Sequence, residues 1–172
     1  MDRDQALVAF YRGLRPDGRG RMLDDILARD DEWLEATHDY IQWLFPLEAR
    51  SGANSAAPVL DEAQIETFRR DPALRGRLLR AFDRLLAFYG LRRAGEAVVK
   101  GQNWNARKSN WFVHPTHNNL RITRILASLR LLGLERESSA FLDALTALRD
   151  SEADCAVGEE AYAYWRRAGG GG

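Results

Sequence analysis

The stretch LRGRLLRAFDRLLAFY, residues 74–89, decides the fold class of this chain. Apolar side chains recur in it at intervals of three and four residues, which places them on one stripe of an amphipathic helix. Asp71 followed by Pro72 is the pattern of an N-cap and a first helical residue. Gly90 is a typical C-terminal stop, so we predict one long helix between Pro72 and Gly90. The stripe consists of Leu74, Leu78, Phe82, Leu85 and Tyr89.

A second apolar stripe predicts another long helix further along the chain. Thr116 can cap its start and Gly133 can end it. Asn118 shares the stripe with the apolar side chains, so we expect a buried amide that needs hydrogen-bond partners. Both long helices should be largely buried. The apolar members of the second stripe are Ile122, Ile125, Leu129 and Leu132.

Shorter stripes predict further helices, joined by irregular connections rich in aromatic and polar residues. Residues 50–60 predict a flexible loop. No βαβ alternation and no strong strand pattern is visible, so we predict an all-α fold. We expect one domain over 1–168, a bundle of six to eight helices, with a disordered glycine tail at 169–172. The shorter helices are expected over 4–14 and 22–27, after Asp30 or Asp31, from Asp61, around Phe141–Leu148, and near Tyr162 and Trp165.

Composition places the chain among ordinary globular proteins. Of its 172 residues, 45% are hydrophobic and 29% are charged, and 25 basic residues balance 25 acidic ones. The net charge is therefore zero and does not indicate binding to nucleic acid or anionic lipid. Cys155 is the only cysteine, which excludes an intramolecular disulfide and fits a reducing compartment. Because no signal-peptide pattern and no run of about 18 apolar residues is present, we expect a cytoplasmic protein without a membrane span.

The nonapeptide HDYIQWLFP, residues 38–46, mixes polar side chains with aromatic and aliphatic ones and stops at a proline. Neither an amphipathic helix nor an alternating strand needs this mixture. The apolar side chains favour burial, and His38, Asp39 and Gln42 then need partners. The nonapeptide predicts a fixed, partly buried polar cluster, which is either structural or ligand-binding.

Catalytic and metal-binding interpretations of the histidines are weaker. An enzyme would use His38 and Asp39 as an acid–base pair, together with His117. Adjacent residues on a helix do not face each other, however, and no activated nucleophile stands beside them. Zinc ligation by His38, His114 and His117 lacks a known ligand spacing. We predict no catalytic residue, no metal site and no cofactor.

The second long helix opens with a polar run at residues 116–124. A guanidinium beside a helix N-terminus can hold a carboxylate or a phosphate. The structural alternative is helix capping together with an ion pair to the acidic segment 24–39. The polar side chains of the run are His117, Asn118, Asn119, Arg121 and Arg124.

A locally basic stretch, residues 69–93, contains eight arginines and two aspartates. It offers an alternative function, a nucleic-acid-associated module, in which the arginines face phosphates. The other interpretation is that these arginines attract the acidic segment 24–39 within the fold. Solvated or internally paired charges are the commoner outcome for such a run, so nucleic acid is not the favoured partner.

Five motifs stand in a distinctive order along the chain: Phe10-Tyr11-Arg12, Pro16-Asp17-Gly18, residues 38–47, Asn103-Trp104 and residues 117–129. Together, from about Phe10 to Glu135, they resemble the N-terminal domain of the opioid growth factor receptor family. The resemblance implies opioid growth factor receptor activity, which in animals is binding of the opioid peptide Met-enkephalin by a protein associated with the nucleus. It implies no catalytic residues. Arginine-rich and alanine-rich usage leads us to expect a bacterial member, and the stop of the sequence soon after the domain leads us to expect a stand-alone one.

We therefore predict a non-catalytic domain that binds an unknown peptide or small anionic ligand. The site is expected where residues 38–46 meet the run 116–124. Trp43 or Trp104 would form an apolar wall, and Arg121 or Arg124 would hold the anionic group. The predicted ligand-binding residues are His38, Asp39, Gln42, Trp43, Trp104, His117, Asn118, Asn119, Arg121 and Arg124.

Overall fold

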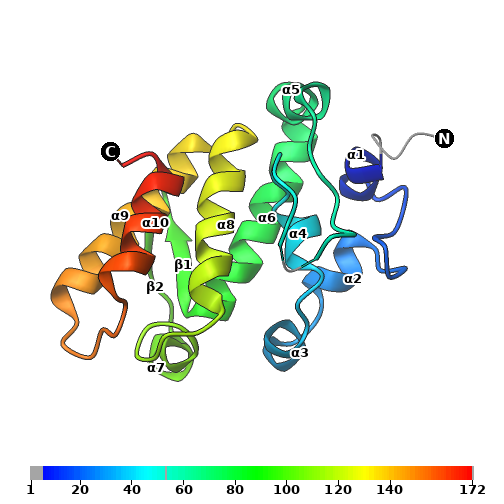
Figure 1. Ribbon diagram of the computed structural model, residues 1–172. Coiled ribbons are helices and arrows are strands. Elements are labelled where there is room, and N and C mark those ends of the chain that lie inside the picture. The colour runs from blue at the N-terminus through cyan, green and yellow to red at the C-terminus, as the bar shows by residue number, and fades with distance from the viewer. Residues whose placement is uncertain (1–5, 53, 172) are drawn as a thin grey trace. The chain divides into compact units, whose positions relative to one another are not determined.

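The computed structural model describes residues 6–52 and 54–171, and this part of the chain is mostly helical (Figure 1). Ten α-helices and one two-stranded sheet occur among the described residues. The all-α prediction is therefore confirmed only as a mostly helical fold. The expected six to eight helices were too few, because helices of a single turn carry no apolar stripe. The elements are α1 (Ala6–Tyr11), α2 (Leu23–Leu27), α3 (Asp31–Ala36), α4 (Ile41–Leu44), α5 (Glu62–Arg70), α6 (Pro72–Tyr89), β1 (Leu91–Ala94), β2 (Ala97–Lys100), α7 (Trp104–Arg107), α8 (Asn118–Leu131), α9 (Glu135–Ser151) and α10 (Glu159–Gly169).

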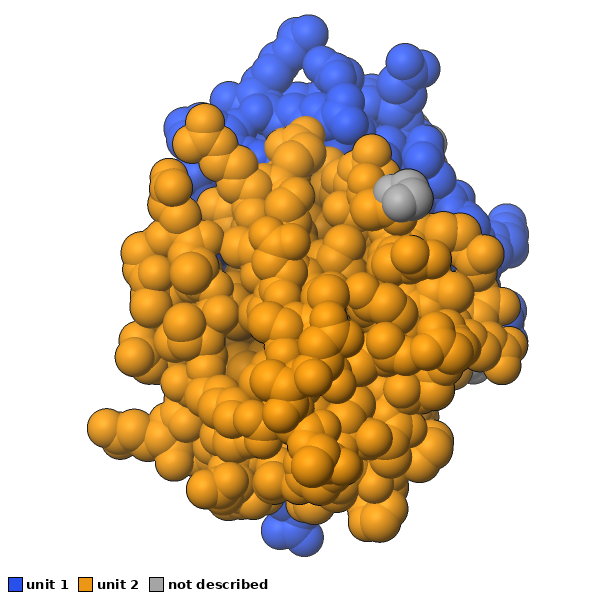
Figure 2. Space-filling view, turned by 90° about the vertical axis from the view of Figure 1, so that its left-hand side faces the viewer, with its two compact units in different colours: residues 1–81, 131–133 blue, residues 82–130, 134–172 orange. Residues whose placement is uncertain are grey.

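The chain divides into two compact units, which Figure 2 colours separately. Unit 1 comprises residues 1–81 and 131–133, and unit 2 comprises residues 82–130 and 134–172. Helices α1 to α5 belong to unit 1, whereas the hairpin, α7, α9 and α10 belong to unit 2. Helix α6 contributes its first part to unit 1 and its second part to unit 2. The single domain over 1–168 stays a prediction.

Helix α6 confirms the helix predicted from the first apolar stripe. Asp71 Oδ1 accepts hydrogen bonds from the backbone N–H groups of Ala73 (2.9 Å) and Leu74 (3.4 Å). These bonds satisfy donors that a helix start leaves open. Gly90 follows the helix with a φ of 83°, the left-handed conformation that favours glycine at a helix end. All five apolar side chains of the stripe are buried.

The caps of other predicted helices are also confirmed. Asp30 Oδ1 accepts from the backbone N–H of Trp33 (2.8 Å) at the start of α3. At the start of α5, Asp61 and Gln64 bond each other's backbone N–H groups reciprocally. The second long stripe lies on α8 and on Leu132, which directly follows it, and the four apolar side chains of the stripe are buried. Gly133 follows α8 with a φ of 91°.

The hairpin of β1 and β2 overturns the expectation that the chain has no strands. The two strands run antiparallel, with Leu91 paired to Lys100 and Ala94 paired to Ala97. Gly95 opens the two-residue turn with a φ of 62°, a conformation that such hairpin turns require. β2 packs against α9 within unit 2.

Aromatic rings fill the interior of unit 1. Phe10 meets Trp43 edge to face at 5.3 Å, and Tyr11 meets Phe68 at 5.0 Å. The Tyr11 hydroxyl donates to the backbone carbonyl of Leu44. Because these contacts join α1, α4 and α5, the nonapeptide is anchored in the core of this unit.

Unit 2 buries a second set of aromatic rings. Trp111 lies 5.6 Å from Tyr89 and 6.2 Å from Trp165, measured between ring centroids. Its indole N–H donates to the backbone carbonyl of Tyr89 (3.0 Å), and that of Trp165 donates to the carbonyl of Asn119 (3.0 Å). The two indoles are fully buried and their polar atoms are satisfied.

The connection between α9 and α10 is held by the two lysines of the chain. Lys100 forms an ion pair with Glu152, and Lys108 forms one with Asp154. The backbone N–H of Ala156 also donates to the carbonyl of Phe112 (2.8 Å). These contacts bind the connection to β2 and to the segment after α7.

The glycines at 169–171 take part in the end of α10. Gly169 is the last helical residue, and Gly170 caps the helix with a φ of 85°. The N–H of Gly171 donates to the carbonyl of Arg166 (2.8 Å), a helix-closing bond. The structure thus differs from the expected disordered tail as far as residue 171, and Gly172 lies outside the described residues. None of the described helices is long and apolar enough to cross a membrane.

Candidate functional site

Asp39 of the nonapeptide belongs to a network of charges in unit 1. It accepts hydrogen bonds from Arg19 Nε (3.0 Å) and from Arg21 NH1 (2.9 Å). Arg21 Nε also donates to Asp17 (2.7 Å), whose carboxylate is buried. Burial opposes ionisation of Asp39, but the hydrogen bonds and charge of Arg21, followed by those of Arg19, lower the pKa of Asp39 below its ordinary value. Asp39 is therefore an ionised structural partner, a poor acid for proton transfer.

The other polar residues of the nonapeptide differ in their exposure. His38 is exposed, and Gln42 retains only 4% of its accessible surface. Within the described residues, the Gln42 Oε1 atom accepts no hydrogen bond. The Tyr40 hydroxyl, in contrast, donates to the carbonyl of Leu34 (3.0 Å). The expected polar cluster is thus centred on Asp39.

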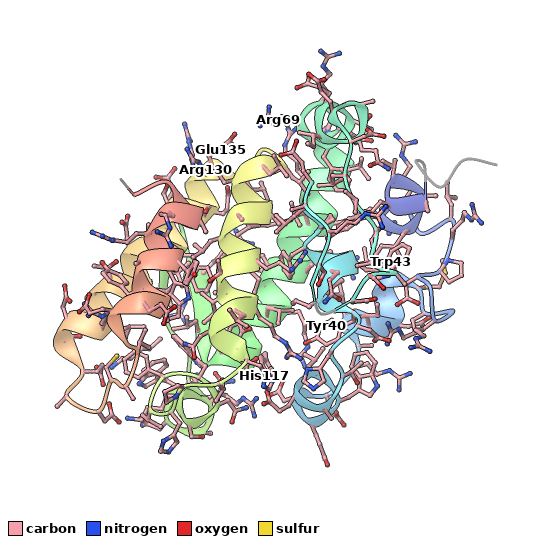
Figure 3. The ribbon with its side chains drawn as sticks, viewed as in Figure 1. Tyr40, Trp43, Arg69, His117, Arg130 and Glu135 are labelled. Atoms are coloured by element: carbon pink, nitrogen blue, oxygen red, sulfur yellow. The ribbon has the colours of Figure 1, made fainter. Side chains whose placement is uncertain are left out.

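Trp43 borders a cavity of about 410 Å³ inside unit 1. Figure 3 labels Trp43 on α4. Leu7 of α1 and the loop residues 56–59 form the remaining apolar wall, while Arg50, Ser55 and Gln64 add polar groups. The volume falls within the range of about 300–1,000 Å³ that is usual for small-ligand sites. The prediction that Trp43 forms an apolar wall therefore has a matching cavity in the fold.

Hydrogen bonds to nearby residues of the same chain hold the start of α8. Thr116 Oγ1 accepts from the backbone N–H of Asn118 (3.2 Å), and Asn119 Oδ1 accepts from that of Thr116 (3.0 Å). The side-chain amide of Asn118 donates to the carbonyl of Asn110 (3.1 Å), and that of Asn119 donates to the carbonyl of Trp111 (3.2 Å). The two asparagines thus tie the helix start to the preceding segment.

The two arginines predicted to hold an anion are substantially buried. Arg121 retains 5% of its accessible surface, and its NH1 group donates to Asn118 Oδ1 (3.3 Å). Burial lowers the pKa of Arg124. His117, labelled in Figure 3 at the start of α8, is exposed. The geometry of Arg121 favours the structural interpretation of the run 116–124.

Trp104 lies in the aromatic core of unit 2. Its ring centroid lies 6.0 Å from that of Trp111 and 5.1 Å from that of Phe112. Lys100 Nζ stands 5.3 Å from the Trp104 ring, which adds a cation–π contact. Because Trp104 is buried by these neighbours, it is a poor candidate for a ligand wall.

Several arginines of the basic stretch 69–93 form contacts with other residues of the chain, some of them at the surface. Arg80 pairs with Asp24 (2.9 Å), and Arg93 pairs with Asp83 (2.6 Å). Arg70 pairs with Glu66 (3.2 Å). Arg69 Nε donates to the carbonyl of Leu131 (2.9 Å), and Arg75 donates to the carbonyl of Arg69. These contacts favour internal pairing over a phosphate-facing surface.

The predicted residues fall into two groups, one in each unit. Unit 1 holds His38, Asp39, Gln42 and Trp43, and unit 2 holds the other six. The contact expected between the two motifs stays a prediction. Among the described residues, no three His, Cys, Asp or Glu side chains gather as a metal site would require.

Sequence reasoning missed several residues beside Trp43. Arg50 and residues 55–59 belong to the stretch predicted only as a flexible loop. Leu7 was predicted as part of a helix, but no local signal pointed it toward a cavity. Sequence reasoning also did not pair Arg19 and Arg21 with Asp39, although the charge of Asp39 is opposite to theirs.

Comparison with known proteins gives the family. Residues 3–152 match the family described as "Opioid growth factor receptor (OGFr) conserved region". The opioid growth factor receptor of Rattus norvegicus is 42% identical over 141 residues, and that of Homo sapiens is 41% identical. The opioid growth factor receptor-like protein 1 of Mus musculus is 37% identical over 143 residues.

The matched region is only part of these relatives. Each match covers 77% of this chain but 24% of the rat receptor, 20% of the human receptor and 29% of the mouse receptor-like protein. No solved structure matches the chain significantly. The family match nevertheless covers most of the chain and includes both long motifs. The chain therefore belongs to the opioid growth factor receptor conserved-region family.

Proposed function

We propose that this chain is a non-catalytic domain that binds a peptide or a small anionic ligand in the cavity beside Trp43. The cavity of about 410 Å³ is the observation that carries the proposal, because it combines an aromatic wall with a few polar groups. The names of the relatives, which are receptors for an opioid growth factor or resemble them, support a binding role. The salt bridges that hold Asp39 ionised weigh against its use as a catalytic acid.

Titration calorimetry with Met-enkephalin, the peptide implied by the family resemblance, tests the proposal. The indole N–H resonances of the chain, followed by NMR in the same titration, locate the contact. We expect the resonance of Trp43, assigned with Trp43→Phe, to shift on binding. Trp43→Ala should weaken binding about tenfold or more, since an aromatic wall contributes much of the contact area.

Trp33→Ala is the matched control. Trp33 is also a half-buried tryptophan of unit 1 and packs against Tyr40 (5.3 Å between centroids), but it does not line the cavity. Its replacement should leave the affinity unchanged. Equal losses in the two variants, with circular dichroism showing both folded, would contradict a site at Trp43.

A further inference from the structure

The cavity beside Trp43 has a mixed lining. Trp43, Leu7 and the small or aliphatic residues of 56–59 form its apolar part, and Arg50, Ser55 and Gln64 contribute polar groups. Val59 keeps 38% of its surface exposed, so its side chain is accessible to a ligand. The Trp43 ring is fixed from behind by Phe10. The cavity therefore offers a preformed surface for one apolar side chain of a ligand.

Arg50 gives this cavity a positive charge. It is exposed, and it forms no ion pair or hydrogen bond within the described part of the chain. No carboxylate occurs among the described residues that line the cavity, so none of these residues neutralises the charge of Arg50. Other arginines of unit 1 have acidic partners. These are Arg12 with Asp71, Arg19 and Arg21 with Asp39, Arg70 with Glu66, and Arg80 with Asp24.

The hydrogen-bond donors that Arg50 and Ser55 bring to the cavity suit a carboxylate. A guanidinium binds a carboxylate through two parallel N–H···O hydrogen bonds. Ser55 adds one hydroxyl to the lining. A dianionic phosphate usually recruits several cationic or backbone N–H donors, and this cavity supplies a single cation.

Resting on the function proposed above, we infer that the cavity binds the C-terminal residue of a peptide, with its apolar side chain against Trp43 and its carboxylate on Arg50. A peptide end fits better than a fatty acid, because the hydroxyl of Ser55 places a polar group beside the apolar part of the wall. This hydroxyl can form a hydrogen bond with a backbone amide of a peptide, whereas a hydrocarbon chain would leave it without a partner.

Three small probes test this inference by NMR titration of the Trp43 indole resonance. They are N-acetyl-L-phenylalanine, its C-terminal amide, and octanoate. We expect the carboxylate form to bind about tenfold more tightly than the amide, since a charge-assisted pair contributes about 1.4 kcal/mol or more. Octanoate should bind more weakly than N-acetyl-L-phenylalanine.

Arg50→Gln should reduce the affinity for N-acetyl-L-phenylalanine to that for the amide and leave the amide unaffected. Arg15→Gln, another exposed arginine of unit 1 that lies outside the cavity, is the matched control and should change neither affinity. Circular dichroism should show both variants folded, because neither arginine forms an ion pair within the described residues.

The outcomes separate this inference from the function on which it rests. Equal binding of the acid and the amide would overturn the carboxylate assignment while leaving a ligand site at Trp43. Octanoate binding as tightly as the acylated amino acid would overturn the peptide assignment. Absence of a Trp43 shift with all three probes would overturn the inference, and the Met-enkephalin titration would then decide the proposed function separately.

Discussion

The tryptophans of the two units occupy opposite kinds of environment. Trp111 and Trp165 in unit 2 are fully buried, and each donates its indole N–H to a backbone carbonyl. Trp43 in unit 1 is half-buried beside a cavity, and its indole donates no hydrogen bond within the described residues. The sequence surrounds both kinds with polar residues. Two features therefore distinguish a tryptophan of the core from one that borders a cavity. The indole N–H of the core residue forms a hydrogen bond, and other side chains fill the space around its ring.

Trp111→Ala should have the largest effect on stability. Truncation of this fully buried ring leaves a void and removes the hydrogen bond to Tyr89, so we expect a loss of about 3–5 kcal/mol in the free energy of unfolding. Urea denaturation followed by circular dichroism measures it. A loss below about 1 kcal/mol would show that Trp111 contributes little to the core, and the contrast with Trp43 would not hold.

Arg121→Ala tests whether the polar start of α8 is structural. We expect a loss of about 2–3 kcal/mol, because a buried guanidinium and its bond to Asn118 disappear together. Arg130→Ala, an exposed position on the same helix, should cost much less. If thermal melting shows that Arg121→Ala is as stable as the parent, the structural interpretation of Arg121 is wrong and anion binding becomes the better interpretation.

Trp43→Ala should destabilise the protein less than Trp111→Ala does. A half-buried ring beside an existing cavity loses mainly its contact with Phe10, so we expect about 1–2 kcal/mol. The same urea series measures both variants. A loss as large as that of Trp111→Ala would show that Trp43 has a core role, and the contrast between the units would disappear.

Asp39→Asn should have the smallest effect, and this effect depends on pH. The pKa of Asp39 in the folded chain lies below its ordinary value of 3.8. Its contribution is complete above the unfolded pKa and is lost as pH falls through the folded pKa. We expect the variant to be about 1 kcal/mol less stable near pH 6 and to match the parent at the lowest pH at which both fold.

Glu48→Gln is the matched control for this pH series. Glu48 is exposed and forms no ion pair or hydrogen bond within the described residues. Its replacement should leave stability unchanged at every pH. A constant difference between Asp39→Asn and the parent across the series would assign the effect to packing, not to charge.

Local signals predicted the long helices well but not the short elements. Asp71, Asp61 and Gly90 mark helix ends through their own side chains or backbone, so their roles can be read from neighbouring residues. Strand β1 buries only Leu91, and β2 only Val98, which is too little for an alternating pattern. Helices α4 and α7 span four residues each and show no stripe.

The candidate site also contains some residues that the local sequence predicts and others that only the folded chain reveals. Trp43 was predicted because its segment needs burial and partners, both of which are local requirements. The importance of Arg50 depends on its place in the cavity and on the lack of an acidic partner among the described residues, and only the folded chain shows these two features. Arg121 had the composition of an anion-binding residue, but its burial follows from how unit 2 packs around α8.

The two lysine ion pairs at the α9–α10 connection have a practical consequence. Apart from these two side chains, the cationic residues are arginines, which amine-directed reagents and acetyltransferases do not modify. Acylation of Lys100 and Lys108 would abolish their positive charges and loosen Glu152 and Asp154 together. A fluorophore or surface linker attached through lysine would therefore report on this connection, whereas the Trp43 cavity carries no lysine among its described lining residues.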